Sequence, residues 1–173
     1  MVIPGFVISI VTFPGVIVHE FAHEVFCRLT GTEVIEVCYF RLGNPAGYVI
    51  HAPASTIWKH ILIGVGPFVG NSLLGFSIGL LASRDVLQTG RLTTIGTLLT
   101  WLGVSIAMHS FPSTGDAKSM WATIWQKGTP ITAKVVGIPL VALIVVGAIG
   151  SIFWLDLVYG VAIVWGLPKL LLG

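Results

Sequence analysis

Long runs of apolar residues are the feature that most limits how this chain can fold. An α-helix needs about 20 mostly apolar residues to cross the hydrocarbon core of a bilayer. Runs near that length cover Val2 to about Leu29, about Ile57 to Leu81, about Leu92 to Met108 and about Val135 to Trp154, with a shorter run from about Leu155 to Leu172. We therefore expect an all-α, polytopic integral membrane protein with four to five transmembrane helices, the count depending on whether the last run spans.

The composition excludes several other classes of protein. Charged side chains make up 9% of the 173 residues, against about 25% in soluble domains. A net charge of +2 spread among apolar runs offers no basic face for phosphates, so the expected partner is the lipid bilayer and not a nucleic acid. Cys27 and Cys38 are too few for a disulfide framework and lack the spacing of a metal-binding pair.

Positive charges predict the orientation in the membrane. The first apolar run has neither a positive n-region nor an A-x-A-like cleavage site, so we interpret it as a retained transmembrane segment. The loops after the first and third runs carry Arg28, Arg41 and Lys59, and Lys118, Lys127 and Lys134, whereas the loop between them has only Arg84 and Arg91. The positive-inside rule then puts the N-terminus outside and both longer loops in the cytoplasm.

Two segments between the runs have patterns of their own. In residues 32–52, β-branched and aromatic stretches flank turn residues at 43–47, which predicts a β-hairpin, and its low charge suggests that it dips into the membrane against the helices. From Asp116 to Lys127, apolar residues recur at helical spacing, which predicts an interfacial helix that stops at Gly128. We treat residues 1–173 as a single transmembrane domain, with a core at about 2–130 and C-terminal helices at about 131–173.

An H-E-x-x-H motif lies inside the first apolar run. His19 and His23 are four residues apart, so they share one helix face and can reach the same zinc ion. Glu20 lies one step round the helix, close enough to act as a general base on a water molecule at the metal. The pattern therefore predicts a Zn²⁺ site inside the membrane domain.

The position of the motif in an apolar helix supports this interpretation. An acidic residue at the centre of a membrane helix costs about 2.5–3.5 kcal/mol even on lenient scales, so Glu20 and Glu24 need compensating partners. For Glu24 we expect an ion pair with Arg28 one turn later. The alternative for the two histidines is that they only hydrogen bond to neighbouring helices.

A third metal ligand can be sought by elimination. On the expected topology, Asp85 and Asp156 lie at the outer side of the membrane, away from the motif. Glu33 and Glu36 follow the first helix so closely that the chain would have to fold straight back. Asp116 remains as the candidate ligand, and its alternative role is an ordinary helix N-cap.

Four motifs follow one another in a recognisable order. They are His19-Glu20-Phe21-Ala22-His23, a G-x-E-V-x-x-V segment from Gly31 followed by Gly43 and Gly47, Gly66-Pro67-Phe68-Val69-Gly70-Asn71, and Phe111-Pro112-Ser113-Thr114-Gly115-Asp116. Over roughly residues 10–125 this order resembles the site-2 protease family of intramembrane zinc metalloproteases, as a compact member without a PDZ-like or nucleotide-binding appendage. The family's usual spacing has one residue fewer before the asparagine and two fewer before the aspartate.

The resemblance implies a role for each motif residue. His19, His23 and Asp116 would bind zinc, Glu20 would be the general base, and Asn71 would help to hold the substrate or the oxyanion. The expected function is that of a zinc-dependent intramembrane endopeptidase, which hydrolyses peptide bonds in or near the transmembrane segments of membrane proteins, with its active site towards the cytoplasm. The hairpin edge around Tyr48 to His51 would hold the unwound substrate by strand addition.

Two questions stay open at the level of the sequence. A non-catalytic pseudoprotease that binds transmembrane partners is the alternative function, and the two extra residues before Asp116 favour it. His109, seven residues before Asp116, is either a donor to the transition state or a polar cap at the membrane interface.

Overall fold

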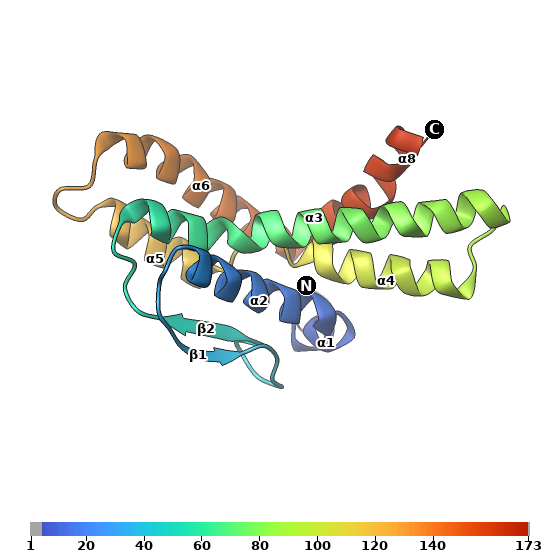
Figure 1. Cartoon of the computed structure of the whole chain (residues 1–173), viewed down its shortest axis with the longest axis horizontal. Helices are drawn as coiled ribbons and strands as arrows, with labels where there is room; N and C mark the ends of the chain where they lie inside the picture. The colour runs from blue at the N-terminus through green and yellow to red at the C-terminus, as the bar shows by residue number, and fades with distance from the viewer. Residues whose placement is uncertain (1–4, 173) are drawn as a thin grey trace.

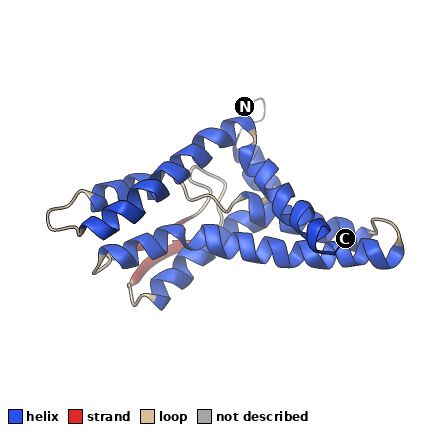
Figure 2. Ribbon diagram, turned by 90° about the horizontal axis from the view of Figure 1, so that it is seen from above, coloured by secondary structure: helices blue, strands red, loops and turns tan. Residues whose placement is uncertain are grey.

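The structure is a computed structural model that describes residues 5–172, and these are mostly helical (Figures 1 and 2). Three helical segments are long and apolar enough to cross a membrane, namely Ile57–Thr89, Ile131–Phe153 and Leu155–Leu172, and a bent N-terminal pair would make a fourth. The expected membrane-type helices are thus confirmed, whereas a count of four to five spans is not. Residues 2–4 of the first expected span lie outside the described residues.

The first apolar run is not one straight helix. It forms α1 (Gly5–Val11) and α2 (Phe13–Leu29), which meet at an angle of 87°. Pro14 lies in the first turn of α2, where it has no N–H to donate to the carbonyl four residues earlier and its ring would clash with that carbonyl in a continuous helix. The bend at Thr12 follows from this proline and separates the motif-bearing helix from the N-terminal segment.

The longest helix organises the rest of the fold. Figure 1 shows α3 (Ile57–Thr89) along the long axis of the molecule, with α4 (Thr94–Met108) returning beside its second half. The turn between them follows Gly90, which ends α3 with a left-handed φ of 70°. A Cβ on Gly75 would lie 2.7 Å from the Cβ of Ala107, so the glycine permits close packing of α3 and α4 here. At 15 residues, α4 is shorter than a full span.

The predicted hairpin is present beside α2. Strands β1 (Val34–Cys38) and β2 (Tyr48–His51) pair antiparallel, with Cys38 opposite Tyr48 and Val34 opposite His51. A bulge interrupts β1 between Val34 and Glu36. Aromatic contact joins the hairpin to the helix, since the rings of Phe21 and Tyr39 lie 6.4 Å apart.

The predicted interfacial helix is also present, as α5 (Thr114–Ile124). It ends three residues before Lys127, and Gly128 has a left-handed φ of 90° in the turn that follows. Helix α6 (Ile131–Gly150) packs against α5 next to the first half of α3 (Figure 1). Their buried contact is an apolar cluster formed by Ile61, Ala117, Met120, Ile124, Val141 and Ile144.

The C-terminal part is divided by a break after α6. A 3₁₀ turn (Ser151–Phe153) leads to Trp154 in a left-handed conformation with φ 63°, after which α7 (Leu155–Val161), a π-helical stretch (Ala162–Gly166) and α8 (Leu167–Leu172) follow. Outer faces keep large apolar side chains exposed, including Ile131 at 72% and Leu170 at 81%. Such faces match lipid better than water, which agrees with a membrane location.

Candidate metal centre

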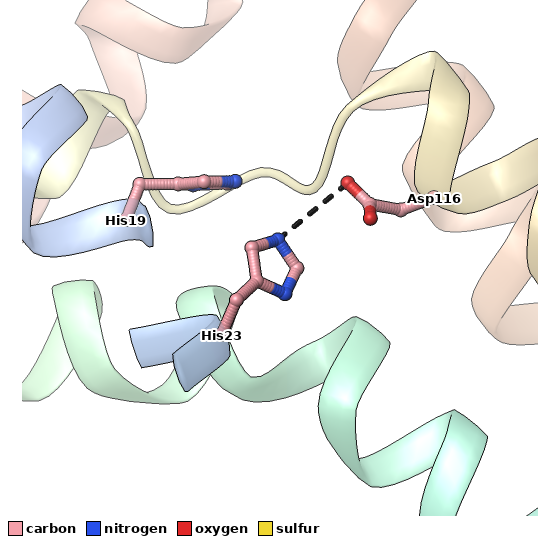
Figure 3. A group of neighbouring side chains, drawn as sticks. All are labelled: His19, His23 and Asp116. Atoms are coloured by element: carbon pink, nitrogen blue, oxygen red, sulfur yellow. Dashed lines mark ion pairs between the residues drawn. The ribbon is translucent and has the colours of Figure 1, made fainter. Parts of the chain in front are cut away.

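The three predicted ligands come together from two distant segments. His19 and His23 occupy successive turns of α2, and Asp116 approaches from the first turn of α5 (Figure 3). One ligand atom of each residue lies within 4.8 Å of the others, and His23 Nε2 is 3.7 Å from Asp116 Oδ2. Within residues 5–172, no other three His, Cys, Asp or Glu side chains form such a group.

Backbone carbonyls orient both histidine rings. His19 Nδ1 lies 2.7 Å from the His109 carbonyl oxygen, and His23 Nδ1 lies 3.0 Å from the Ile63 carbonyl oxygen. Because a carbonyl oxygen only accepts, each Nδ1 is the protonated donor and each Nε2 keeps its lone pair. Histidines that bind metals are commonly held in this way, with the ring nitrogen that is not coordinated donating to a carbonyl.

The Ile63 carbonyl is available because of a proline in α3. In a regular helix this oxygen would accept from the N–H of residue 67, but Pro67 has none. His23 supplies the missing donor. The Gly66-Pro67 pair of the sequence thus has a specific structural consequence, which is a helix carbonyl left free to hold a candidate ligand.

The His109 carbonyl is free for a different reason. His109 is the C-cap of α4, where carbonyls have no partner within the helix. Asn71, fully buried on α3, donates its side-chain amide to this oxygen at 3.3 Å and also to the Ile106 carbonyl at 3.1 Å. Asn71 and His19 therefore share one acceptor.

This placement bears on the role expected for Asn71. Its side chain is not on the wall of the cavity that contains the candidate ligands, and its amide bonds to backbone behind His19. Contact with a substrate stays a prediction. In the structure, Asn71 of α3 instead connects three helices. Besides its contacts at the end of α4, it donates to the Gly15 carbonyl of α2.

Asp116 is fixed by the start of its own helix. Ser113, and not Asp116, is the N-cap of α5, and the two residues form a capping box. Asp116 Oδ2 accepts from the Ser113 N–H at 2.7 Å and from the Ser113 hydroxyl at 2.6 Å. The helix-start role and the position facing His23 thus belong to one side chain. The alternative role of Asp116 as the N-cap is therefore wrong, because Ser113 holds that position. Asp116 nevertheless stabilises the start of the helix as the N3 residue of the capping box.

The charge state of Asp116 suits a metal ligand. Burial alone raises the pKa of its carboxyl group, but the opposing interactions with His23 and with Ser113 together outweigh burial. The pKa therefore lies below its ordinary value, and the carboxylate is ionised at neutral pH.

Glu20 borders the same cavity without belonging to the ligand group. Its side chain is buried, and the backbone of Gly47 in the hairpin lies against it. A Cβ added to Gly47 would come within 2.6 Å of Glu20 Cγ. Only glycine allows this close approach. Gly47 therefore belongs to the site, although its place in the sequence motif indicated no specific role.

The other acidic residue of α2 is neutralised elsewhere. Glu24 Oε1 accepts from Arg28 Nε at 2.8 Å, and Glu24 also accepts from the Tyr39 hydroxyl. The expected ion pair is confirmed. Cys27, one turn beyond His23, is fully buried, as expected of a packing residue.

The candidate ligands line a cavity of about 520 Å³. Its wall includes His109, the hairpin residues from Pro45 to Val49, His51, and Asp156 from the start of α7. The expectation that Asp156 lies away from the motif is therefore wrong, because the break after α6 brings the start of α7 to the cavity. Asp85, in contrast, accepts from Thr93 at the far end of α3 and does not line it.

One edge of β2 faces this cavity with free backbone groups. The Ala52 N–H and the Ala46 carbonyl both hydrogen bond across the hairpin, at 2.9 and 2.7 Å. Backbone groups of successive residues in a strand point to opposite edges, so the even-numbered residues of β2 face β1. The N–H and C=O of Val49 and His51 point to the other edge, with which no further strand pairs among the described residues. We call this the open edge.

Comparisons with known proteins give no further guide: no family model matches this chain, and no match is found among curated proteins or among solved structures.

Proposed function

We propose that this protein is a zinc-dependent intramembrane endopeptidase that hydrolyses peptide bonds of transmembrane proteins. One observation carries the proposal, namely that the ligand group of His19, His23 and Asp116 shares a cavity with a buried glutamate and with the open edge of a strand. Each part has a separate task in peptide hydrolysis, and few other chemistries need all three together.

The ligand group fits zinc in its donors and spacing. Two histidine nitrogens and one carboxylate oxygen form a common catalytic zinc set, in which the fourth position is left for water or substrate. Ligand atoms around a tetrahedral zinc ion lie about 3.3 Å apart, given bonds of about 2.0–2.1 Å. The separation of 3.7 Å between His23 and Asp116 is close to this value, and all three ligand atoms lie within 4.8 Å of one another, so binding a zinc ion would draw them closer together.

The bound metal would supply two things, a lowered pKa for water and polarisation of the peptide carbonyl. Glu20 takes a proton from the attacking water and later delivers it to the leaving amine. Its carboxylate is held in position by burial and by the backbone of Gly47. His109 lies on the same cavity wall, and because its Nδ1 donates to the Ser105 carbonyl at 2.9 Å, its Nε2 is an acceptor in the neutral ring and could donate to the reacting carbonyl oxygen only after the ring takes up a proton.

The open edge explains how a membrane segment would be held. A transmembrane helix buries its amides in its own hydrogen bonds, so a protease must bind it locally unwound. The N–H and C=O groups of Val49 and His51 can pair with such an extended stretch beside the ligand group. Substrates are therefore transmembrane segments that unwind readily at one point.

The orientation follows from the charged loops and has its own test. We infer that the N-terminus is outside and that the cavity opens towards the cytoplasmic side, because Arg41 and Lys127 belong to the Lys/Arg-bearing loops that flank the segments with the candidate ligands. Cysteines introduced at these two positions should be protected from an impermeant thiol reagent in intact cells. Labelling from outside would reverse the orientation.

The activity is tested with the purified chain and synthetic transmembrane segments in detergent micelles. We expect cleavage that stops when a chelator removes zinc and returns when zinc is added. The alternative function, a pseudoprotease, predicts stable binding of such segments without a cut under any metal loading. Cleavage that persists in excess chelator would contradict the metal-dependent reaction.

A further inference from the structure

A second polar cavity lies at the other end of the open edge. It has a volume of about 480 Å³, and its wall includes His51 of β2, His60 of α3, Ser119 and Thr123 of α5, and Gln126 in the turn that follows α5. We call it the distal cavity. The proposed function leaves it without a task, although it shares two wall residues of β2 with the cavity of the candidate metal centre.

We propose that the distal cavity is a specificity site that takes a carboxamide side chain, Asn or Gln, of the bound peptide. This inference rests on the proposed function, since it concerns the peptide that the open edge would hold. It goes further because it states which side chain the substrate needs and on which part of this chain that side chain is recognised.

The geometry of β2 connects the two cavities. Val49 and His51 line both of them, and the same two residues carry the free backbone groups of the open edge. A peptide paired with this edge in the candidate metal centre must continue past the distal cavity. Side chains of an extended strand alternate between its two faces, so every second residue of the peptide would point towards the same wall.

The hydrogen-bonding groups of the distal cavity select the chemistry. His51 Nδ1 donates to the Ala52 carbonyl at 2.7 Å, so Nε2 of the neutral ring is left as an acceptor. His60 Nε2 and the Ser119 hydroxyl pair with each other at 3.2 Å, and the Thr123 hydroxyl donates to the Ser119 carbonyl at 2.9 Å. The side-chain groups that remain for a ligand therefore include the acceptor nitrogen of His51, Nδ1 of His60 and the side-chain amide of Gln126.

A carboxamide meets this set best. It donates to the imidazole nitrogen through its NH₂ group and exchanges a donor and an acceptor with the Gln126 amide. A carboxylate has no proton to offer the neutral imidazole, and an ammonium or guanidinium group would find no carboxylate, since no Asp or Glu is on this wall. An apolar side chain would bury the polar groups without partners.

The test uses a synthetic transmembrane segment with one Gln moved along it a residue at a time, and matched series with Glu, Leu or Lys. In the wild-type chain, mass spectrometry should find the cut at one fixed offset from the Gln, with at least fivefold faster cleavage than in the other series. Gln126→Leu should remove this preference but keep slow cleavage. Lys127→Leu, next to it and off the cavity wall, is the matched control and should behave as wild type.

Two results would overturn the inference. One is a cut position that ignores the placement of the Gln, and the other is the same preference in Gln126→Leu as in Lys127→Leu. A preference for Glu over Gln would also contradict it, because it would require cationic histidines in place of the acceptor described above.

A second measurement keeps the two proposals apart. The Glu20→Gln chain is mixed with segments that carry a photoreactive residue next to the Gln, and the cross-linked residues are mapped. Cross-links to α5 that depend on the Gln would support the distal cavity even if the wild-type chain cuts nothing, in which case only the protease proposal fails. Cross-links confined to other elements would refute the distal cavity even if cleavage occurs.

Discussion

Replacing Pro67 with alanine should weaken metal binding and stabilise the metal-free protein at the same time. Alanine restores the N–H that a regular helix directs at the Ile63 carbonyl, so this oxygen gains a competitor for His23 Nδ1. Loss of such an outer partner typically lowers metal affinity tenfold to a hundredfold. Because the carbonyl has two lone pairs and can accept both donors, we expect the lower end, about tenfold, or about 1.4 kcal/mol.

The effect on stability has the opposite sign. A proline in a helix interior costs about 3 kcal/mol relative to alanine. Pro67 is fully buried, and truncating its ring removes about two buried methylene groups, at about 0.8 kcal/mol each. The free energy of unfolding of the metal-free Pro67→Ala chain should therefore be about 1 kcal/mol higher than that of wild type.

Zinc affinity is measured by competition with a chromophoric chelator, and stability by unfolding in mixed micelles after the metal is removed. Pro139→Ala is the matched control, because Pro139 lies inside α6 and off the cavity wall. It should leave zinc affinity unchanged. If Pro67→Ala binds zinc as tightly as Pro139→Ala does, the Ile63 carbonyl does not orient the ligand and our explanation of Pro67 is wrong.

Four further substitutions separate the parts of the site. Glu20→Gln keeps about one zinc per chain by metal analysis but should lower cleavage by at least 10²-fold, the usual effect of losing a general base; a wild-type rate would remove Glu20 from the reaction. Gly47→Ala places a Cβ 2.6 Å from Glu20 Cγ and 3.0 Å from the Cys38 and Tyr39 carbonyl oxygens, so cleavage should fall while zinc content changes little. Val49→Pro removes a donor from the open edge and should abolish cleavage with zinc retained. Ile50→Pro removes a donor that faces β1 and should also lower the unfolding midpoint; equal activity of Val49→Pro and wild type would refute strand addition.

The parts of the fold that follow from local patterns were predictable from the sequence. Alternation around a turn indicated the hairpin at residues 32–52, and helical spacing indicated α5. The pairing of Glu24 with Arg28 was predictable because residues four apart in a helix lie on the same face. The bend between α1 and α2 also has a local cause in Pro14, but a hydrophobic run alone does not reveal its angle.

The sequence predicted which residues form the site, but not how they are arranged in space. The spacing of His19 and His23 and the elimination of other acids led to Asp116, which the structure brings to them. Asp156 was expected away from the motif because each apolar run was treated as a separate straight helix, whereas the break after α6 brings this residue to the cavity wall. The turn through Trp154 depends on how α6 and α7 pack, which no short window of sequence contains.

The carbonyl partners of the histidines could not be predicted either. They depend on which turns of α3 and α4 lie beside α2, a property of tertiary packing. The signal that could have indicated one of them is Pro67 itself, because a proline inside a membrane helix leaves one carbonyl without its usual donor. The position of that carbonyl, opposite His23, needed the structure.

The most direct test of the central claim is the zinc content of the purified chain beside its His23→Ala and Asp116→Ala variants. Our account predicts about one zinc per wild-type chain and a clear loss in both variants, because each removes one of three ligands. Ser113→Ala, which weakens the start of α5 but leaves the Asp116 carboxylate in place, should keep most of the metal. A wild-type chain without zinc, or an Asp116→Ala chain with full occupancy, would contradict the metal centre described here.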